Sequence, residues 1–102
     1  MPEFVKVATT AELGPGEAKR VEVGGKAIAL FNIGVSYHAI DNTCPHRGGP
    51  LSEGGVEGEV VTCPWHGSKF NVTTGEVLEA PARTGVSSHR VRLTGTDIEV
   101  EV

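Results

Sequence analysis

The feature that most constrains this chain is a pair of short segments that each combine a cysteine with a histidine. The first is Cys44-Pro45-His46 and the second is Cys63-Pro64-Trp65-His66, and together they hold both cysteines and two of the four histidines of the protein. Thiolate and imidazole ligands together select zinc, copper or iron–sulfur centres. A fold that brings both segments to one metal site is therefore the first expectation.

Several uses of these residues are open. Structural zinc ligands usually come as a cysteine pair followed by a histidine pair or a second cysteine pair, whereas each segment here mixes the two types. Mononuclear copper sites favour a methionine ligand, and Met1 is the only methionine. A disulfide would need an oxidising compartment. A two-iron cluster that takes sulfur on one iron and nitrogen on the other suits the mixed segments best, and a structural zinc module is the alternative.

The strand pattern predicts an all-β protein. Alternating or continuous apolar residues predict strands at 4–7, 19–23, 27–31, 35–40, 89–93 and 98–102, with a hairpin turn at Gly24-Gly25 and a second turn at 94–97. A short helical turn capped by a threonine is expected at 9–13. No segment keeps a 3.6-residue apolar period, which argues against an α-helical or α/β fold.

Residues 41–81 differ from the rest of the chain. This stretch holds seven glycines and four prolines, and its predicted strands are short. The 102 residues are enough for one domain, residues 1–102. We therefore expect an antiparallel β-sandwich or barrel in which residues 41–81 form an inserted unit that carries the metal site.

The composition restricts the partners. The formal net charge of −4 argues against nucleic acid and anionic membranes and suits a basic patch on a protein partner. No segment approaches the ~20 consecutive apolar residues of a membrane span. The first residues lack the pattern of a signal peptide, so we expect a cytoplasmic location without membrane association. Acidic residues near the site serve as a solvated surface or steer a basic partner: Glu53, Glu57, Glu59, Glu76 and Glu79.

The two segments resemble the signature of the Rieske [2Fe–2S] family. The likeness covers Cys-Pro-His-Arg-Gly-Gly-Pro-Leu at 44–51 and Cys-Pro-Trp-His-Gly-Ser-Lys-Phe at 63–70, and it extends to the 37–40 strand, Thr74-Gly75 and Pro81. The resemblance implies a Rieske-type fold with one [2Fe–2S] cluster in the inserted unit. It also implies that Cys44 and Cys63 bind one iron. His46 and His66 are implied to bind the other.

The resemblance also bears on the reduction potential. Neutral imidazole ligands raise Rieske potentials to about −150 to +300 mV. High-potential family members carry an additional cysteine in each loop, which together form a disulfide, and a tyrosine near a thiolate. Here the corresponding residues are Gly49, Trp65 and Phe70. We therefore expect a potential in the lower half of the range.

The surroundings of the site can also be predicted. Hydrogen-bond donors to the sulfurs are expected among Arg47, Gly48, Gly49, Gly67 and Ser68. An apolar collar with a small docking face is expected from Pro45, Pro50, Leu51, Trp65 and Pro81. The remaining histidines, His38 and His89, lie on predicted strands without a neighbouring ligand and are expected to be structural.

The resemblance implies a one-electron carrier rather than an enzyme. Its implied partners are a ferredoxin reductase and a terminal oxygenase, as in aromatic-ring dioxygenase systems. The alternative is the small subunit of an NAD(P)H-dependent nitrite reductase. A transient carrier needs only a small interface, so we expect a monomer.

Overall fold

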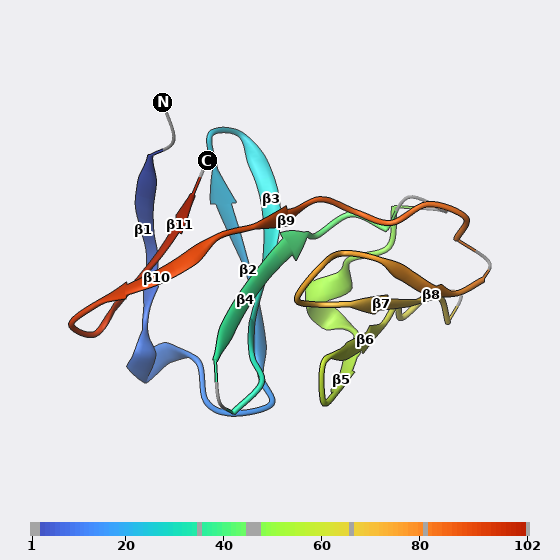
Figure 1. The fold of residues 1–102 in the computed structure, drawn as a ribbon, viewed down its shortest axis with the longest axis horizontal. Coiled ribbons are helices and arrows are strands. Elements are labelled where there is room, and N and C mark those ends of the chain that lie inside the picture. Colours follow the sequence, from blue (N-terminus) through green and yellow to red (C-terminus); the bar gives the residue numbers. More distant parts are fainter. Residues whose placement is uncertain (1–2, 35, 45–47, 66, 81, 102) are drawn as a thin grey trace.

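The computed structural model describes residues 3–34, 36–44, 48–65, 67–80 and 82–101. These residues form antiparallel β-sheets and two single turns of 3-10 helix, η1 (Thr10–Glu12) and η2 (Leu51–Glu53), and they contain no α-helix (Figure 1). The predicted all-β class is confirmed. No helix within these ranges has the length and apolar character that crossing a membrane requires.

The strands form three sheets. The first has the order β1-β11-β10, made of β1 (Phe4–Thr9), β11 (Asp97–Glu101) and β10 (Val91–Thr94). The second has the order β2-β3-β4-β9, made of β2 (Ala18–Val23), β3 (Lys26–Asn32), β4 (Tyr37–Asp41) and β9 (Ser88–His89). The third has the order β5-β6-β7-β8, made of β5 (Gly55–Glu57), β6 (Val60–Thr62), β7 (Lys69–Asn71) and β8 (Val77–Glu79).

The predicted hairpin between residues 19 and 31 is confirmed. Strands β2 and β3 pair without interruption from Ala18 opposite Phe31 to Val23 opposite Lys26. The two turn residues, Gly24 and Gly25, have φ of +59° and +80°. A two-residue turn with positive φ at both positions matches the right-handed twist of the strands, and glycine adopts it without steric cost.

Strand β3 lies in the interior of the molecule, because its residues from Ile28 to Asn32 are all buried. Its side chains alternate between two cores. The basal core consists of Ala8, Leu13, Val21, Val23, Ile28, Leu30, Ala39, Ile98 and Val100. The cysteine-side core consists of Ala29, Phe31, Ile40, Cys44, Leu51, Val61, Cys63, Phe70, Val72 and Ala82. The continuous apolar run at 27–31 is thus explained by burial on both faces.

The predicted strand at 89–93 is wrong as a single element. His89 pairs with Ala39 in the second sheet, whereas Val91 pairs with Val100 in the first. Arg90 lies between them, and its carbonyl accepts a hydrogen bond from the Glu101 N–H at 2.8 Å. The chain therefore changes sheets at Arg90, because the two halves of the predicted strand pair with different strands.

In sequence, the four strands of the third sheet come between two strands that are neighbours in the second sheet. Strand β4 pairs with β9, and β5 to β8 come between them in sequence (Figure 1). The chain leaves the second sheet after Asp41 and returns to it at Ser88. Both cysteines lie in this inserted segment, between Asp41 and Ser88.

Candidate metal centre

The two cysteines begin loops with the same backbone hydrogen bonds. In loop 1 (residues 44–49), the Cys44 N–H donates to the Gly49 carbonyl at 2.9 Å, and the Cys44 carbonyl accepts from the Gly48 N–H at 2.7 Å. In loop 2 (residues 63–68), the Cys63 N–H donates to the Ser68 carbonyl at 2.7 Å, and the Cys63 carbonyl accepts from the Gly67 N–H at 3.1 Å. Each cysteine is therefore held at the start of an equivalent turn.

Each loop is closed and bent in the same way. A β-bridge joins Thr43 to Pro50 around loop 1, and the β6–β7 pair joins Thr62 to Lys69 around loop 2. The fifth residue of each loop is a glycine with positive φ, +76° at Gly48 and +80° at Gly67. Other residues adopt this conformation only with strain, which explains the Thr-Cys-Pro-x-x-Gly sequence that both loops share.

This geometry corrects one prediction about hydrogen bonds to sulfur. The expectation that Gly48 and Gly67 aim their amides at the sulfurs is wrong, because both amides donate to a cysteine carbonyl instead. Their role is to shape the loops. Arg47, a further candidate donor, lies outside the described residues.

The fold brings the two cysteine loops together. Cys44 and Cys63 are each 2% exposed, belong to the cysteine-side core, and are thiols rather than a disulfide pair. A Cβ built on Gly49 would lie 2.7 Å from the Cys63 Sγ, so the backbone of loop 1 touches the sulfur of loop 2. Two buried thiols in one core, on matching loops that touch at Gly49, are the sulfur half of the donor set that a two-iron cluster requires.

Ser68, the last residue of loop 2, has a buried polar side chain. It is fully buried, and its Oγ accepts a hydrogen bond from the Ala82 N–H at 2.9 Å. A hydroxyl that accepts one bond still has a proton to donate. Buried polar groups are normally satisfied, so a cluster sulfur suits that proton, as the sequence predicts. The residues present thus fit an iron–sulfur group.

The ligand histidines of the prediction, His46 and His66, lie outside the described residues, as do Pro45 and Pro81. The other two histidines have partners, as predicted for structural histidines. His38 Nε2 lies 2.7 Å from Ser36 Oγ, and His89 Nε2 lies 2.8 Å from Asp41 Oδ1.

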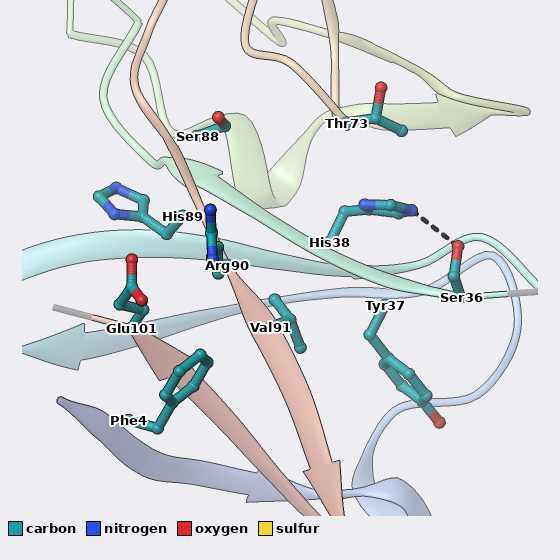
Figure 2. A pocket seen from close by; sticks show the side chains of 10 residues that line it. All are labelled: Phe4, Ser36, Tyr37, His38, Thr73, Ser88, His89, Arg90, Val91 and Glu101. Carbon is teal, nitrogen blue, oxygen red and sulfur yellow. Dashed lines mark hydrogen bonds between the residues drawn. The ribbon is translucent and has the colours of Figure 1, made fainter. Parts of the chain in front are cut away.

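Both partnered histidines line a pocket of about 640 Å³ that contains neither cysteine (Figure 2). In Figure 2, the His38 ring points toward Ser36, to which a dashed line joins it. The pocket lies beside β4 and β9 rather than between the cysteine loops. It does not belong to the candidate metal centre.

The exposure of the residues near the loops agrees in part with the collar and the acidic surface that the sequence predicts. Trp65 is 57% exposed and Pro50 is half-buried, as a collar would require. Leu51 is fully buried in the cysteine-side core, so its prediction as part of a docking face is wrong. Phe70 is fully buried in the same core. The five predicted acidic residues are all exposed: Glu53, Glu57, Glu59, Glu76 and Glu79.

Asp41 lies at the base of the loops and is not among the residues that the sequence predicts for the site. Its carboxylate binds His89, Lys26 at 3.0 Å, and the Ser87 N–H at 3.4 Å. Burial by itself raises the pKa of Asp41, but the hydrogen bonds from His89 and Lys26 outweigh it, so the pKa lies below its usual 3.8. The only signal in the sequence is an aspartate at the end of a strand, which does not identify a partner 48 residues away.

Comparison with known proteins agrees with this site. The family model described as Rieske [2Fe-2S] domain matches residues 3–90. The ferredoxin component of biphenyl 2,3-dioxygenase from Rhodococcus jostii (strain RHA1) is 37% identical over 97% of this chain and 92% of its own length. The solved ferredoxin of carbazole 1,9a-dioxygenase from Nocardioides aromaticivorans IC177 has a TM-score of 0.91 and 33% identity, with 95% of each chain covered.

A second solved structure is a complex of reduced oxygenase and oxidized ferredoxin in carbazole 1,9a-dioxygenase. One of its chains matches with a TM-score of 0.89 and 33% identity, covering 95% of this chain and 91% of that chain. The relatives are thus of similar length to this chain and are named as ferredoxins of dioxygenase systems.

The fold and the paired cysteine loops define an iron–sulfur protein of small size. The chain belongs to the Rieske [2Fe–2S] domain family. It is an electron carrier with one Rieske-type [2Fe–2S] cluster, as its ferredoxin relatives are, and not a catalyst by itself. The cluster supplies a centre that accepts and returns one electron.

Proposed function

We propose that this protein carries single electrons from a ferredoxin reductase to the terminal oxygenase of a ring-hydroxylating dioxygenase system. The observation that carries the proposal is the pair of equivalent cysteine loops, in a chain whose relatives over nearly its whole length are ferredoxin components of such systems. The nitrite reductase small subunit is the less favoured alternative, because the ferredoxins of the biphenyl and carbazole dioxygenase systems share 37% and 33% identity with this chain.

The ligand set of this proposal is Cys44 and Cys63 on one iron and His46 and His66 on the other. The burial of both thiols in one core and the contact of loop 1 with the Cys63 sulfur support the cysteine pair. The histidine pair is supported by sequence, because each histidine follows a cysteine by two or three positions within an equivalent loop. We expect a potential in the lower half of about −150 to +300 mV, since Gly49 and Trp65 stand where high-potential members carry the additional disulfide cysteines and Phe70 offers no hydroxyl.

We propose that residues 1–102 form one domain in which residues 41–81 are the cluster-binding subdomain. Two features support this division. The sheet β5 to β8 and both cysteine loops lie between β4 and β9 in sequence, and the cysteine-side core joins them to β3 and β4. We also propose that the carrier is a cytoplasmic monomer, because a transient partner change needs only a small interface and reduced thiols suit that compartment.

The charge distribution supports docking to a basic protein surface. Residues 53–79 contain five glutamates and one lysine, while the rest of the chain has equal numbers of acidic and basic residues, so this stretch accounts for the whole net charge of −4. A groove of about 350 Å³ crosses the same region, lined by Glu57, Val60, Thr62, Lys69, Leu78 and Glu79. Thr62 and Lys69 flank loop 2 directly. A basic partner attracted here would approach the cysteine loops.

The experiment that tests the ligand set is metal analysis of purified protein with matched variants. We expect equal iron and acid-labile sulfide in the wild type and loss of the visible spectrum in Cys63→Ala and His66→Ala. His38→Ala is the control, because His38 is bonded to Ser36 and should leave the spectrum unchanged. Zinc without iron, or an unchanged spectrum in His66→Ala, would contradict the assignment.

The experiment that tests the partners is electron transfer in a reconstituted system. The protein is reduced with NADH and a ferredoxin reductase of a dioxygenase system, and its reoxidation by the oxygenase is followed by absorbance. We expect reoxidation to depend on oxygenase concentration. Transfer to a sirohaem nitrite reductase and none to the oxygenase would favour the alternative function.

A further inference from the structure

The contact between Gly49 and Trp65 joins the two cysteine loops directly. A Cβ built on Gly49 would lie 3.1 Å from Cγ and 3.3 Å from Cδ2 of the Trp65 indole, in addition to 2.7 Å from the Cys63 Sγ. Gly49 is buried, and its carbonyl holds the Cys44 N–H. One residue of loop 1 thus touches the sulfur and the aromatic ring of loop 2.

Trp65 lies at the surface and not in either core. It is 57% exposed, so nearly half of its surface is covered while the rest faces solvent. Part of the covered surface lies on the Gly49 backbone, beside the sulfur of Cys63, a residue that is 2% exposed. An aromatic ring on a glycine backbone allows the closest approach of two loops, because no side chain separates them.

We propose that Trp65 and Gly49 form a clamp that closes the two loops over the Cys63 sulfur and thereby sets the reduction potential and the retention of the cluster. The inference rests on the proposed role of Cys63 as an iron ligand. Trp65 and Gly49 are positioning residues, since they act through the sulfur that they cover. Solvent exposure of the cluster is one of the factors that tune its potential, and the reduced site is the more negatively charged state, which water stabilises.

The clamp predicts that alanine substitutions at two exposed apolar residues, Trp65 and Leu93, have different effects. Trp65→Ala opens the loops, raises the midpoint potential and speeds cluster loss in chelator about tenfold or more, the scale on which residues around a metal site affect its retention. Trp65→Phe keeps an aromatic ring on Gly49 and restores both quantities toward the wild type. Leu93→Ala, which removes a side chain that is 50% exposed on β10, changes neither. A Trp65→Ala variant that behaves like Leu93→Ala overturns the proposal.

A second measurement does not require the cluster. Trp65 is the only tryptophan, so the intrinsic tryptophan fluorescence of the purified protein reports this ring alone. Gly49→Ala forces the indole away, and its emission moves to longer wavelength with stronger acrylamide quenching. Gly55→Ala is the control, because a Cβ there meets nothing within 4 Å. Unchanged emission in Gly49→Ala overturns the clamp, whereas absence of iron overturns the proposed function and leaves this fluorescence test valid.

Discussion

The Asp41 carboxylate and the His89 imidazole lie 2.8 Å apart, at the two points where the chain leaves the second sheet and returns to it. The pair is only partly exposed, at 20% and 16% of the two side chains. The contact thus joins the two ends of the inserted segment that contains both cysteine loops. Lys26 adds a third group to the same carboxylate.

Asp41→Asn is expected to lower the free energy of unfolding by about 1–3 kcal/mol, because it removes the charge that three donors hold. Asp97→Asn is the control, since its ion pair with Lys6 is exposed and should contribute at most about 1 kcal/mol. Denaturant unfolding at neutral pH measures both. Equal losses in the two variants would contradict a special role for Asp41.

The same carboxylate predicts a pH dependence. The folded pKa of Asp41 lies below its usual 3.8, since hydrogen bonds from His89 and Lys26 outweigh the effect of burial. Its stabilisation is therefore fully present above the unfolded pKa of about 3.9 and is lost as the pH falls through the lower folded value. We expect wild type and Asp41→Asn to converge in stability in this acidic range, and a difference that stays constant to low pH would disprove the explanation.

Gly54→Ala is expected to destabilise the protein by about 3 kcal/mol or more, because overpacking against backbone cannot relax by side-chain rotation. A Cβ at Gly54 would lie only 2.0 Å from the Thr62 carbonyl oxygen. The adjacent Gly55→Ala meets open space and should stay within about 0.5 kcal/mol of the wild type. Thermal unfolding of the two variants side by side measures the contrast, and similar midpoints would show that the third sheet accommodates the extra methyl group.

Ser68→Ala is expected to cost about 1–3 kcal/mol, because the Ala82 N–H loses its acceptor in a buried position. We also expect a more negative midpoint potential, since a hydroxyl donor near the sulfurs stabilises the reduced state. Ser87→Ala, at an exposed residue, is the control. Hydrogen exchange at the Ala82 amide reports the lost bond, and full protection in Ser68→Ala would show that another acceptor replaces it.

Lys19→Met is expected to raise the pKa of Glu12 toward its usual 4.5. In the wild type, the Lys19 hydrogen bond at 2.8 Å, helped by the Thr9 N–H, lowers that pKa to about 2. The ionised carboxylate therefore stabilises the fold above pH 4.5 and loses this effect as the pH falls toward 2. Carboxyl-carbon NMR titration measures the change, and Lys26→Met, which removes a cation that pairs with Asp41 instead, should leave Glu12 unaltered.

Glu57→Gln combined with Glu79→Gln is expected to slow electron transfer to a basic partner at low ionic strength and to flatten its salt dependence. Both residues line the groove beside loop 2. Charges at the rim of an interface act mainly on the association rate and are screened over about 10 Å at 0.1 M salt. Glu3→Gln, exposed next to β1, is the control. If it slows transfer equally, the effect comes from net charge and not from this groove.

Local sequence signals predicted the elements whose partners are near in the chain. The hairpin of β2 and β3 follows from two apolar runs and two glycines, because the turn itself fixes the register. The two segments around Cys44 and Cys63 predicted the two halves of one metal site, and the structure adds that both cysteines begin loops with equivalent hydrogen bonds. The histidine half of the site lies outside the described residues and stays a prediction.

Contacts between distant residues could not be predicted in the same way. The change of sheet at Arg90 depends on which strands lie beside β9 and β10, and the sequence between 89 and 93 is equally suited to one strand. Leu51 follows Pro50 and is expected in a surface collar, but it is buried in the same core as Val61 and Phe70. The predicted donors Gly48 and Gly67 are wrong because a glycine-rich loop does not reveal which acceptor its amides reach.

The closed backbone rings around loops 1 and 2 have a consequence for metal incorporation. Each cysteine is oriented by main-chain bonds, with a β-bridge flanking loop 1 and a strand pair flanking loop 2, and none of these bonds involves the sulfur itself. A preorganised frame of this kind loses its ordering entropy during folding, so less is lost when iron and sulfide enter. The cysteine half of the site is thereby ordered by the polypeptide before the inorganic centre binds.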